Sequence, residues 1–302
     1  MKTTVDISII ITAWKEPDTV GPLIKEIANQ IALVTDKKFE VLLVCPDEET
    51  KIAAIKNDEK SILRVVQDEG LGKPSALNKV FDLAKGEWWI LTDGDVVWDK
   101  NVVKEMIVEM VGSKTGGLTG RPVPLNDKNT LFGYWSFALT EMAHKQRFDR
   151  YINGRFIVLS GYLMALHRGI IKELPKTVLS DDALISYIIN NKGYKNKYVP
   201  KAKVYVKFPT NIKDWIKQKA RSGGGYLQLC EFIEVPKDSM RSFKNEVMGI
   251  FDLLRYSSKP KELFWTILLI IARLYLWIII FWERKIIKKA FTKTWLRVES
   301  TK

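Results

Sequence analysis

Two carboxylates, Asp93 and Asp95, stand one residue apart at the end of the apolar run WWILTDGDVVW, residues 88–98. Like charges this close repel each other unless a cation neutralises them. Carboxylate oxygens are the ligands that Mg²⁺ and Mn²⁺ prefer, and these ions often bind substrate phosphates as well. The pair therefore predicts a site for Mg²⁺ or Mn²⁺. By itself, however, the same spacing also fits an acidic loop in which Asp99 caps a helix.

The elements that must position this pair alternate between strands and helices. Short apolar runs rich in β-branched residues predict buried parallel strands, and apolar residues at helical spacing predict the helices between them. The predicted strands cover residues 7–14, 39–45, 62–68 and 87–93, and the helix before the last strand covers 73–84. In such sheets ligands bind beyond the carboxyl ends of the strands. Trp14, Asp47 and Asp93 occupy such ends.

The middle of the chain, residues 101–210, has a less regular pattern. Its residues predict a helix at 101–111, a strand and turn at 116–125, and a strand pair or strand and turn at 155–168. An acidic start predicts a helix at 180–194. Alternation at period two predicts a half-exposed strand at 201–208.

The composition excludes several classes of protein. Cys45 and Cys230 are too distant in sequence for a disulfide framework, which indicates a reducing compartment, and His144 and His167 lie in no zinc-ligand pattern. The N-terminal apolar run is too short for a signal peptide. Residues 1–100 carry 13 basic and 18 acidic side chains, whereas the other 202 residues carry 35 and 17. That basic part fits either an anionic membrane surface or nucleic acid.

Residues 263–282 form a hydrophobic segment that carries one charge, Arg273. As a helix it would be about 30 Å long, enough to cross a bilayer. Glu262, Arg273 and Arg284 fall on one stripe because they are eleven residues apart. A crossing helix would export the tail 283–302, whose seven basic residues oppose that direction, whereas a helix lying in the membrane interface would not. Both arrangements stay open, and the predicted division is a catalytic domain at 1–255 and a membrane-association helix and tail at 256–302.

Five motifs extend from residue 7 to residue 228: SIIITAWKEPDTVGPLIKEI, EGLGKPSALNKVFDLAKGEWWILTDGDVVW, LSGYLMALHR, LSDDALIS and WIKQKARSGGG. Together they resemble the motifs of family 2 glycosyltransferases, and the second matches its family block nearly position for position. The last two depart from the family pattern, because Asp181 replaces a Glu and Ser222 replaces a Trp. The resemblance implies a GT-A fold, which is an α/β fold with a Rossmann-like, mostly parallel central sheet flanked by helices.

The resemblance also implies roles for residues of the nucleotide site. Ala13, Glu16, Asp47 and Lys73 would line the nucleotide pocket, with Asp47 accepting a hydrogen bond from the base, expected to be uracil. Lys73 at a helix N-terminus also suits a pyrophosphate. Asp93 would contact the ribose and metal region. Asp95 would ligate the metal that bridges the diphosphate and neutralises the leaving group.

The last three motifs concern the acceptor side. Asp182 would act as the general base that takes the proton of an acceptor hydroxyl. The alternative is that it only caps a helix, and with a phosphate acceptor it would orient the substrate instead. Gln218 and Arg221 would meet the diphosphate or the acceptor, unless they belong to a solvated basic helix face. The stretch SGGGY, residues 222–226, would be a loop that closes over the substrate or a linker.

The resemblance implies an inverting, metal-dependent glycosyltransferase that uses a UDP-linked sugar. The hydrophobic segment and the basic second half indicate a membrane-associated acceptor, such as a polyprenyl phosphate, a lipid-linked glycan or a glycolipid. The expected location is the cell membrane, with the catalytic domain on the cytoplasmic side and no nucleic-acid partner. The alternatives are a nucleotidyltransferase of similar topology and a non-catalytic protein that binds anionic lipid or nucleic acid.

Overall fold

The structure is a computed structural model that describes residues 5–235, 243–282 and 299–301. The chain divides into two compact units. The first, here called the sheet unit, comprises Met1–Pro122, Ile157–Lys176 and Asp181–Val206. The second, here called the helical unit, comprises Val123–Phe156, Thr177–Ser180 and Lys207–Lys302.

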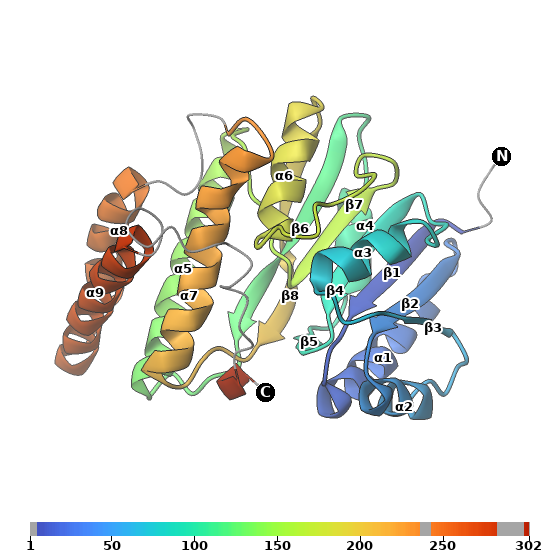
Figure 1. The fold of residues 1–302 in the computed structure, drawn as a ribbon, viewed down its shortest axis with the longest axis horizontal. Helices are drawn as coiled ribbons and strands as arrows, with labels where there is room; N and C mark the ends of the chain where they lie inside the picture. Colours follow the sequence, from blue (N-terminus) through green and yellow to red (C-terminus); the bar gives the residue numbers. More distant parts are fainter. Residues whose placement is uncertain (1–4, 236–242, 283–298, 302) are drawn as a thin grey trace. The chain divides into compact units, whose positions relative to one another are not determined.

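One eight-stranded sheet, in the order β3-β2-β1-β4-β7-β6-β8-β5, forms the centre of the sheet unit (Figure 1). The strands are β1 (Ile7–Thr12), β2 (Phe39–Cys45), β3 (Leu63–Gln67), β4 (Trp88–Asp93), β5 (Val96–Trp98), β6 (Thr115–Pro124), β7 (Leu163–His167) and β8 (Lys195–Val206). The first four strands in chain order are parallel, as predicted, whereas β7 pairs antiparallel with β4 and β6, and β5 pairs antiparallel with β8. The sheet is therefore mixed.

The parallel strands bring distant loops to one edge of the sheet. Every residue of β1 from Ile7 to Ile11 is buried, which explains why this stretch is apolar apart from Ser8 rather than alternating. Thr12 at the end of β1 pairs in register with Asp93 at the end of β4 and with Val44 near the end of β2. The loops that follow these three strands thus begin side by side.

The helices of the sheet unit follow the predicted pattern. They are α1 (Pro17–Ala32), α2 (Glu48–Lys56), α3 (Lys73–Phe81), α4 (Val102–Glu109) and α6 (Asp181–Asn191). Of the two alternatives predicted for residues 155–168, the structure has the strand and turn: a turn closed by an isolated bridge between Ser160 and Leu163 leads into a single strand, β7. The predicted strand at 201–208 starts earlier, at Lys195.

The helical unit contains α5 (Leu131–Ile152), α7 (Ile212–Gln228), α8 (Phe243–Tyr256) and α9 (Pro260–Phe281), with short 3₁₀ turns η1 (Leu229–Glu231) and η4 (Glu299–Thr301). Helix α9 packs against α5 and α7 (Figure 1). Tyr134 and Trp135 of α5 and Trp215 of α7 share an apolar core with Leu269 and Leu276 of α9. Sequence analysis predicted neither the 22-residue helix α5 nor α8.

The prediction of a loop at SGGGY is wrong, because residues 222–226 lie inside α7. A Cβ atom on Gly225 would lie 2.1 Å from Ser180 Oγ, and one on Gly223 would lie 2.7 Å from Ile280 Cδ1. Glycine is unfavourable in a helix by about 1 kcal/mol relative to alanine. Close packing of α7 on its neighbours, rather than flexibility, accounts for these glycines.

The hydrophobic segment 263–282 falls within α9, apart from the last residue, Trp282, which is its C-cap. Helix α9 has 22 residues, and its most apolar 18-residue stretch has a mean hydropathy of 2.3, so it is long and apolar enough to cross a membrane, although core helices can meet the same criteria. Arg284, expected on the polar stripe, lies outside the described residues. The predicted boundary between residues 255 and 256 stays a prediction.

Candidate active site

Asp47 joins the loops after β1 and β2. Its Oδ2 atom accepts a hydrogen bond from the Lys15 backbone N–H at 2.7 Å, and its Oδ1 atom caps α2 by accepting from Thr50 N–H at 3.0 Å. Partial burial would raise the pKa of Asp47, but these hydrogen bonds outweigh it and lower the pKa. Thr50 Oγ1 in turn accepts from the Glu16 backbone N–H at 2.8 Å. Asp47 and Thr50 therefore fix the loop that carries Glu16.

Gly94 lies tightly against the same loop. Its N–H donates to Thr12 O at 2.8 Å, and a Cβ atom at this position would lie 2.5 Å from both Ala13 Cβ and Glu16 Oε2. The glycine between the two aspartates therefore permits a close approach of two loops. Ala13 and Glu16 thus lie at the turn that carries Asp93 and Asp95, and their role in a nucleotide pocket stays a prediction.

Lys73 connects the end of β4 to the start of α6. Its Nζ atom donates to Asp93 Oδ1 at 2.5 Å and to Gly161 O at 3.5 Å, and it lies 3.9 Å from Asp181 Oδ2. Thr12 Oγ1 also donates to Asp93 Oδ1, at 3.2 Å. Residues more than 100 positions apart in sequence therefore lie around one ammonium group, and Thr12 joins them through Asp93 and Asp182 through Gly161. This set is here called the Lys73 cluster: Thr12, Lys73, Asp93, Gly161, Asp181 and Asp182.

Negative charge dominates the Lys73 cluster. Burial alone would lower the pKa of Lys73, but Asp93, Asp181 and Asp182 outweigh that effect and raise it, so the ammonium stays charged. Burial, together with Asp182 and Asp93, raises the pKa of Asp181 to about 6 against the opposing effect of Lys73. Asp181 Oδ2 is buried and accepts no hydrogen bond from any described residue. One lysine facing three carboxylates leaves an excess of negative charge.

Asp182 is held at the first turn of α6. Its Oδ2 atom accepts from Gly161 N–H at 3.1 Å, and its Oδ1 atom accepts from Ala183 N–H at 2.8 Å. The loop before β7 and the start of α6 are thereby joined. Sequence analysis did not identify Gly161 or Asp181 as members of the site, although both lie inside the quoted motifs.

The donor set fits a hard divalent cation. Asp93 and Asp95 supply carboxylate oxygens, and Asp181, near Lys73, has an oxygen without a hydrogen bond from any described residue; carboxylate oxygens are the ligands of Mg²⁺ and Mn²⁺. Among the described residues, no group of three or more His, Cys, Asp and Glu side chains forms a complete metal cage. A cation held by Asp95 and Asp93 would therefore take other ligands from water and from a bound diphosphate.

The two remaining predicted residues lie on α7, in the helical unit. Gln218 and Arg221 are both partly buried. Gln218 Oε1 is buried and receives no hydrogen bond from the described part of the chain. The roles predicted for Gln218 and Arg221 stay predictions.

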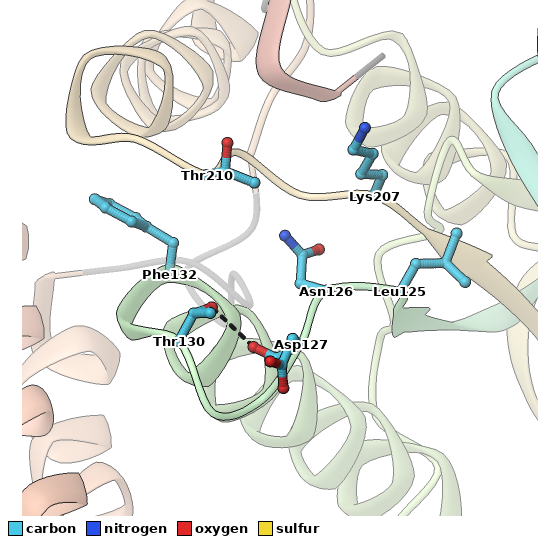
Figure 2. A pocket seen from close by; sticks show the side chains of 7 residues that line it. All are labelled: Leu125, Asn126, Asp127, Thr130, Phe132, Lys207 and Thr210. Carbon is cyan, nitrogen blue, oxygen red and sulfur yellow. Dashed lines mark hydrogen bonds between the residues drawn. The ribbon is translucent and has the colours of Figure 1, made fainter.

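The helical unit also has a hollow of about 390 Å³ at the start of α5 (Figure 2). It is lined by Leu125, Asn126, Asp127, Thr130, Phe132, Lys207 and Thr210. The Asn126 side chain both donates to Phe208 O and accepts from Phe208 N–H, and Thr130 caps α5. These polar groups hold the hollow's own walls together, and it contains none of the predicted site residues.

Comparison with known proteins identifies the family. The model of the family described as "Glycosyltransferase like family 2" matches residues 5–225. The poly-β-1,6-N-acetyl-D-glucosamine synthase of Staphylococcus aureus is 21% identical over 240 residues, and the probable glycosyltransferase YdaM of Bacillus subtilis is 23% identical over 246. Each match covers 76% of this chain and 57% of the relative. The chain thus spans little more than half the length of these curated relatives.

Solved structures share the fold at low sequence identity. A mannosyltransferase from Pyrobaculum calidifontis in complex with GDP-Man and Mn²⁺ is 16% identical, with a TM-score of 0.58 over 97% of this chain and 88% of its own. Glucosyl-3-phosphoglycerate synthase from Mycobacterium tuberculosis in complex with Mg²⁺ and UDP is 16% identical, with a TM-score of 0.53 over 77% and 82%. The chain therefore belongs to the family 2 glycosyltransferases, and its fold is the GT-A fold.

Proposed function

We propose that this glycosyltransferase is metal-dependent and inverting, and that it moves a sugar from a UDP-linked donor to an acceptor held at a membrane. The observation that carries the proposal is the Lys73 cluster. It brings Asp93, at the end of β4, and Asp181, at the start of α6, within 3.9 Å of one ammonium group. Donor-binding and acceptor-activating groups of one reaction need such proximity. The family assignment favours this proposal over the two alternatives, a nucleotidyltransferase and a non-catalytic binding protein.

The donor side of the reaction uses the turn after β4. Asp95 and Asp93 would hold Mg²⁺ or Mn²⁺, which supplies a positive charge to the departing diphosphate. Ala13, Glu16 and Asp47 would line the nucleotide pocket, since Asp47 and Gly94 hold the loop after β1 against this turn. Lys73 would add a second cation for the diphosphate. The choice of a uridine donor is supported by the Mycobacterium tuberculosis neighbour, which was solved with UDP and Mg²⁺. The Pyrobaculum calidifontis neighbour was instead solved with GDP-Man.

The acceptor side would use the start of α6. As the acceptor hydroxyl oxygen bonds to the sugar's anomeric carbon, the bond from that carbon to the diphosphate breaks, and Asp182 takes the hydroxyl proton. Attack from the face opposite the leaving diphosphate inverts the anomeric centre. With a phosphate acceptor no proton needs removal, and Asp182 would orient that substrate. Gln218 and Arg221 are proposed to contact the acceptor or the diphosphate.

The membrane part of the proposal rests on α9 and on the basic tail. The proposed division assigns 1–255 to catalysis and 256–302 to membrane association. The proposed acceptor is a polyprenyl phosphate, a lipid-linked glycan or a glycolipid, and the proposed side of the membrane is the cytoplasmic one, where nucleotide sugars would be supplied. The basic second half is assigned to the membrane surface rather than to nucleic acid.

Membranes that contain the protein provide the test. They are incubated with radiolabelled UDP-glucose, UDP-N-acetylglucosamine or GDP-mannose, and the lipids are then extracted. We expect label from one UDP-sugar in the lipid fraction, lost on chelation with EDTA and in Asp95→Ala. Label from GDP-mannose alone would refute the uridine assignment. Label that persists in EDTA would refute metal dependence, and absence of label in the lipid fraction from all three donors would refute the lipid acceptor.

A further inference from the structure

Helix α9 has two stripes of side chains on opposite faces. The exposed stripe is entirely apolar and consists of Phe264, Ile267, Ile271, Leu274, Ile278 and Phe281, each at least 45% exposed. The buried stripe consists of Thr266, Leu269, Leu276 and Ile280. Each stripe repeats at helical spacing, and residues two apart on a helix are separated by about 200°. A helix on the surface of a soluble protein has the reverse pattern, with its polar face toward water.

The buried stripe is covered along nearly the whole length of α9. Near its start, Trp265 O accepts a hydrogen bond from Trp135 Nε1 at 2.8 Å, and Thr266 Oγ1 lies 2.7 Å from Tyr134 OH. Near its end, Ile280 packs on Gly223 of α7. The hydroxyl of Thr266 is therefore satisfied inside the protein. Helix α9 therefore packs against α5 near its start and against α7 near its end.

This packing conflicts with a helix that crosses a bilayer. Helices α5 and α7 carry charged residues along their length, including Glu141, Lys145, Arg147, Lys217 and Arg221. If α9 crossed the membrane, α5 and α7 would have to enter the hydrocarbon beside it. Charged side chains inside a bilayer are costly and rare. A helix that lies in the plane of the interface buries the exposed stripe and leaves α5 and α7 in water.

The charges around α9 favour an anionic occupant of the exposed stripe. Three basic residues are exposed near the start of α9: Arg255 in the last turn of α8, Lys259 at the N-cap of α9, and Lys261 in its first turn. In the sequence, residues 255–302 carry eleven basic and three acidic side chains, a net charge of +8. Two copies of the chain that met through this face would bring two such charges together. An anionic lipid surface instead attracts each basic residue by about 1 kcal/mol.

From these observations we infer that the exposed stripe of α9 is a docking surface for an anionic lipid bilayer, on which α9 lies flat without crossing it. The inference rests on the proposed function, because it specifies how the enzyme reaches a membrane acceptor. It chooses between the two arrangements that the sequence leaves open. Both ends of α9 would then stay on the same side of the membrane.

Vesicle flotation with the full chain tests the docking surface. We compare wild type, the double variant Ile271→Glu with Ile278→Glu, and the matched control Val108→Glu, which changes a residue 60% exposed on α4. With vesicles of phosphatidylcholine and phosphatidylglycerol, we expect the double variant to bind at least ten-fold more weakly than wild type and the control to bind like wild type. All three changed residues are exposed, so unfolding temperatures should agree within a few degrees. Equal flotation of wild type and the double variant would overturn the inference.

Topology provides the second test. A tag at the C-terminus and a tag at the N-terminus are probed with protease in sealed vesicles from cells that express the protein. We expect the two tags to be digested together or protected together. Digestion of only one tag would show that α9 crosses the membrane. A stable dimer in solution, abolished by the double variant and unable to bind vesicles, would assign the stripe to a second copy and would also overturn the inference.

Failure of this inference can be separated from failure of the proposed function. The thermal shift produced by UDP with Mn²⁺ reports the donor site and involves none of the exposed residues of α9. We expect the double variant to retain that shift in full. A double variant that keeps vesicle binding and the nucleotide shift would refute only the docking surface, whereas a wild type that binds vesicles but shows no nucleotide shift would refute only the proposed donor site.

Discussion

The Lys73 cluster and the packing of α9 on α5 and α7 are both largely buried, but they are held together by opposite means. In the cluster, one ammonium faces three carboxylates, which leaves an excess of negative charge, and Asp181 Oδ2 has no hydrogen-bond partner among the described residues. In the helical unit the contacts are apolar, and the buried pair Tyr134–Thr266 is hydrogen-bonded. Unsatisfied charge is costly and is typical of functional sites, whereas satisfied packing is typical of structure.

The first way to sharpen this comparison is to remove the proposed base. Asp182→Asn keeps an oxygen that can accept from Gly161 N–H, so the fold should persist. General base catalysis contributes about 10²- to 10⁴-fold, and we expect kcat to fall by that factor while UDP binding is unchanged. Steady-state kinetics with a hydroxyl acceptor and calorimetry with UDP measure the two quantities. Activity within a few-fold of wild type would remove Asp182 from the mechanism.

Removing the central cation should test how the cluster is held. Lys73→Met leaves Asp93 and Asp181 without their common partner, and breaking a buried pair costs about 3–5 kcal/mol. We expect the free energy of unfolding in EDTA to fall by about 3 kcal/mol, since Lys73 remains partly exposed, and to recover in part with Mn²⁺, which supplies the missing positive charge. For Lys73→Arg we expect a smaller fall in the free energy of unfolding, because arginine keeps the positive charge.

Urea denaturation with and without Mn²⁺ provides this measurement. If Lys73→Met were as stable as wild type in EDTA, the cluster would not depend on its lysine. If Mn²⁺ stabilised neither protein, the carboxylates around Lys73 would not be poised for a cation.

The helical unit offers a contrast between two glycines of α7, Gly223 and Gly225, which are two positions apart in sequence. A Cβ on Gly225 meets Ser180 Oγ, and Ser180 Cβ and N lie within 3.2 Å, so Gly225→Ala should lower the free energy of unfolding by about 2 kcal/mol. A Cβ on Gly223 meets only the flexible end of Ile280, and alanine gains about 1 kcal/mol of helix propensity, so Gly223→Ala should be nearly neutral.

Thermal unfolding of the two variants compares them directly. Equal stability would contradict the account of close packing at Gly225. Because Ser180 is bonded to Asp181, we also expect Gly225→Ala, but not Gly223→Ala, to lower kcat.

The smallest effect concerns the pH dependence of stability. The pKa of Asp181 rises from 3.8 to about 6 on folding, so this group's contribution is present at low pH and is lost as the pH rises through about 6. Asp181→Asn removes the free-energy cost of ionising this buried carboxyl group. In EDTA we expect the variant to exceed wild type by about 1–3 kcal/mol at pH 7.5, and by about half as much at pH 5. A difference that is independent of pH would show that the Asp181 carboxyl group does not titrate as proposed.

The sequence predicted the sheet unit better than the helical unit for a physical reason. Strands β1, β2 and β4 consist mostly of buried apolar residues, Asp93 ends β4, and Asp47 lies two residues beyond β2, so local pattern and parallel pairing suffice to bring these residues to one edge. By contrast, the role of Gly225 depends on Ser180, 45 residues away, and that contact leaves no local pattern. A glycine run predicts a loop unless its packing partner is known.

Within the site, the sequence predicted the types of chemical group but not how they pair. Lys73 was expected beside a diphosphate, and in the structure its ammonium lies on Asp93 and near Asp181. Lys73 is the first residue of α3, and the N-cap of this helix is Gly72, whose φ of 99° favours glycine. The contact with Asp181 requires α6 to be placed by the rest of the sheet unit, which the spacing of motifs does not specify.

The central claim is that Asp95, with Asp93, holds a divalent cation together with a donor diphosphate. Calorimetry of UDP binding with and without Mn²⁺ tests it in wild type, in Asp95→Ala and in the control Asp36→Ala, which changes an exposed loop carboxylate. We predict that Mn²⁺ strengthens UDP binding at least ten-fold in wild type and in the control, but not in Asp95→Ala. UDP binding that is equally strong without Mn²⁺, or equally strengthened by Mn²⁺ in Asp95→Ala, would contradict the claim.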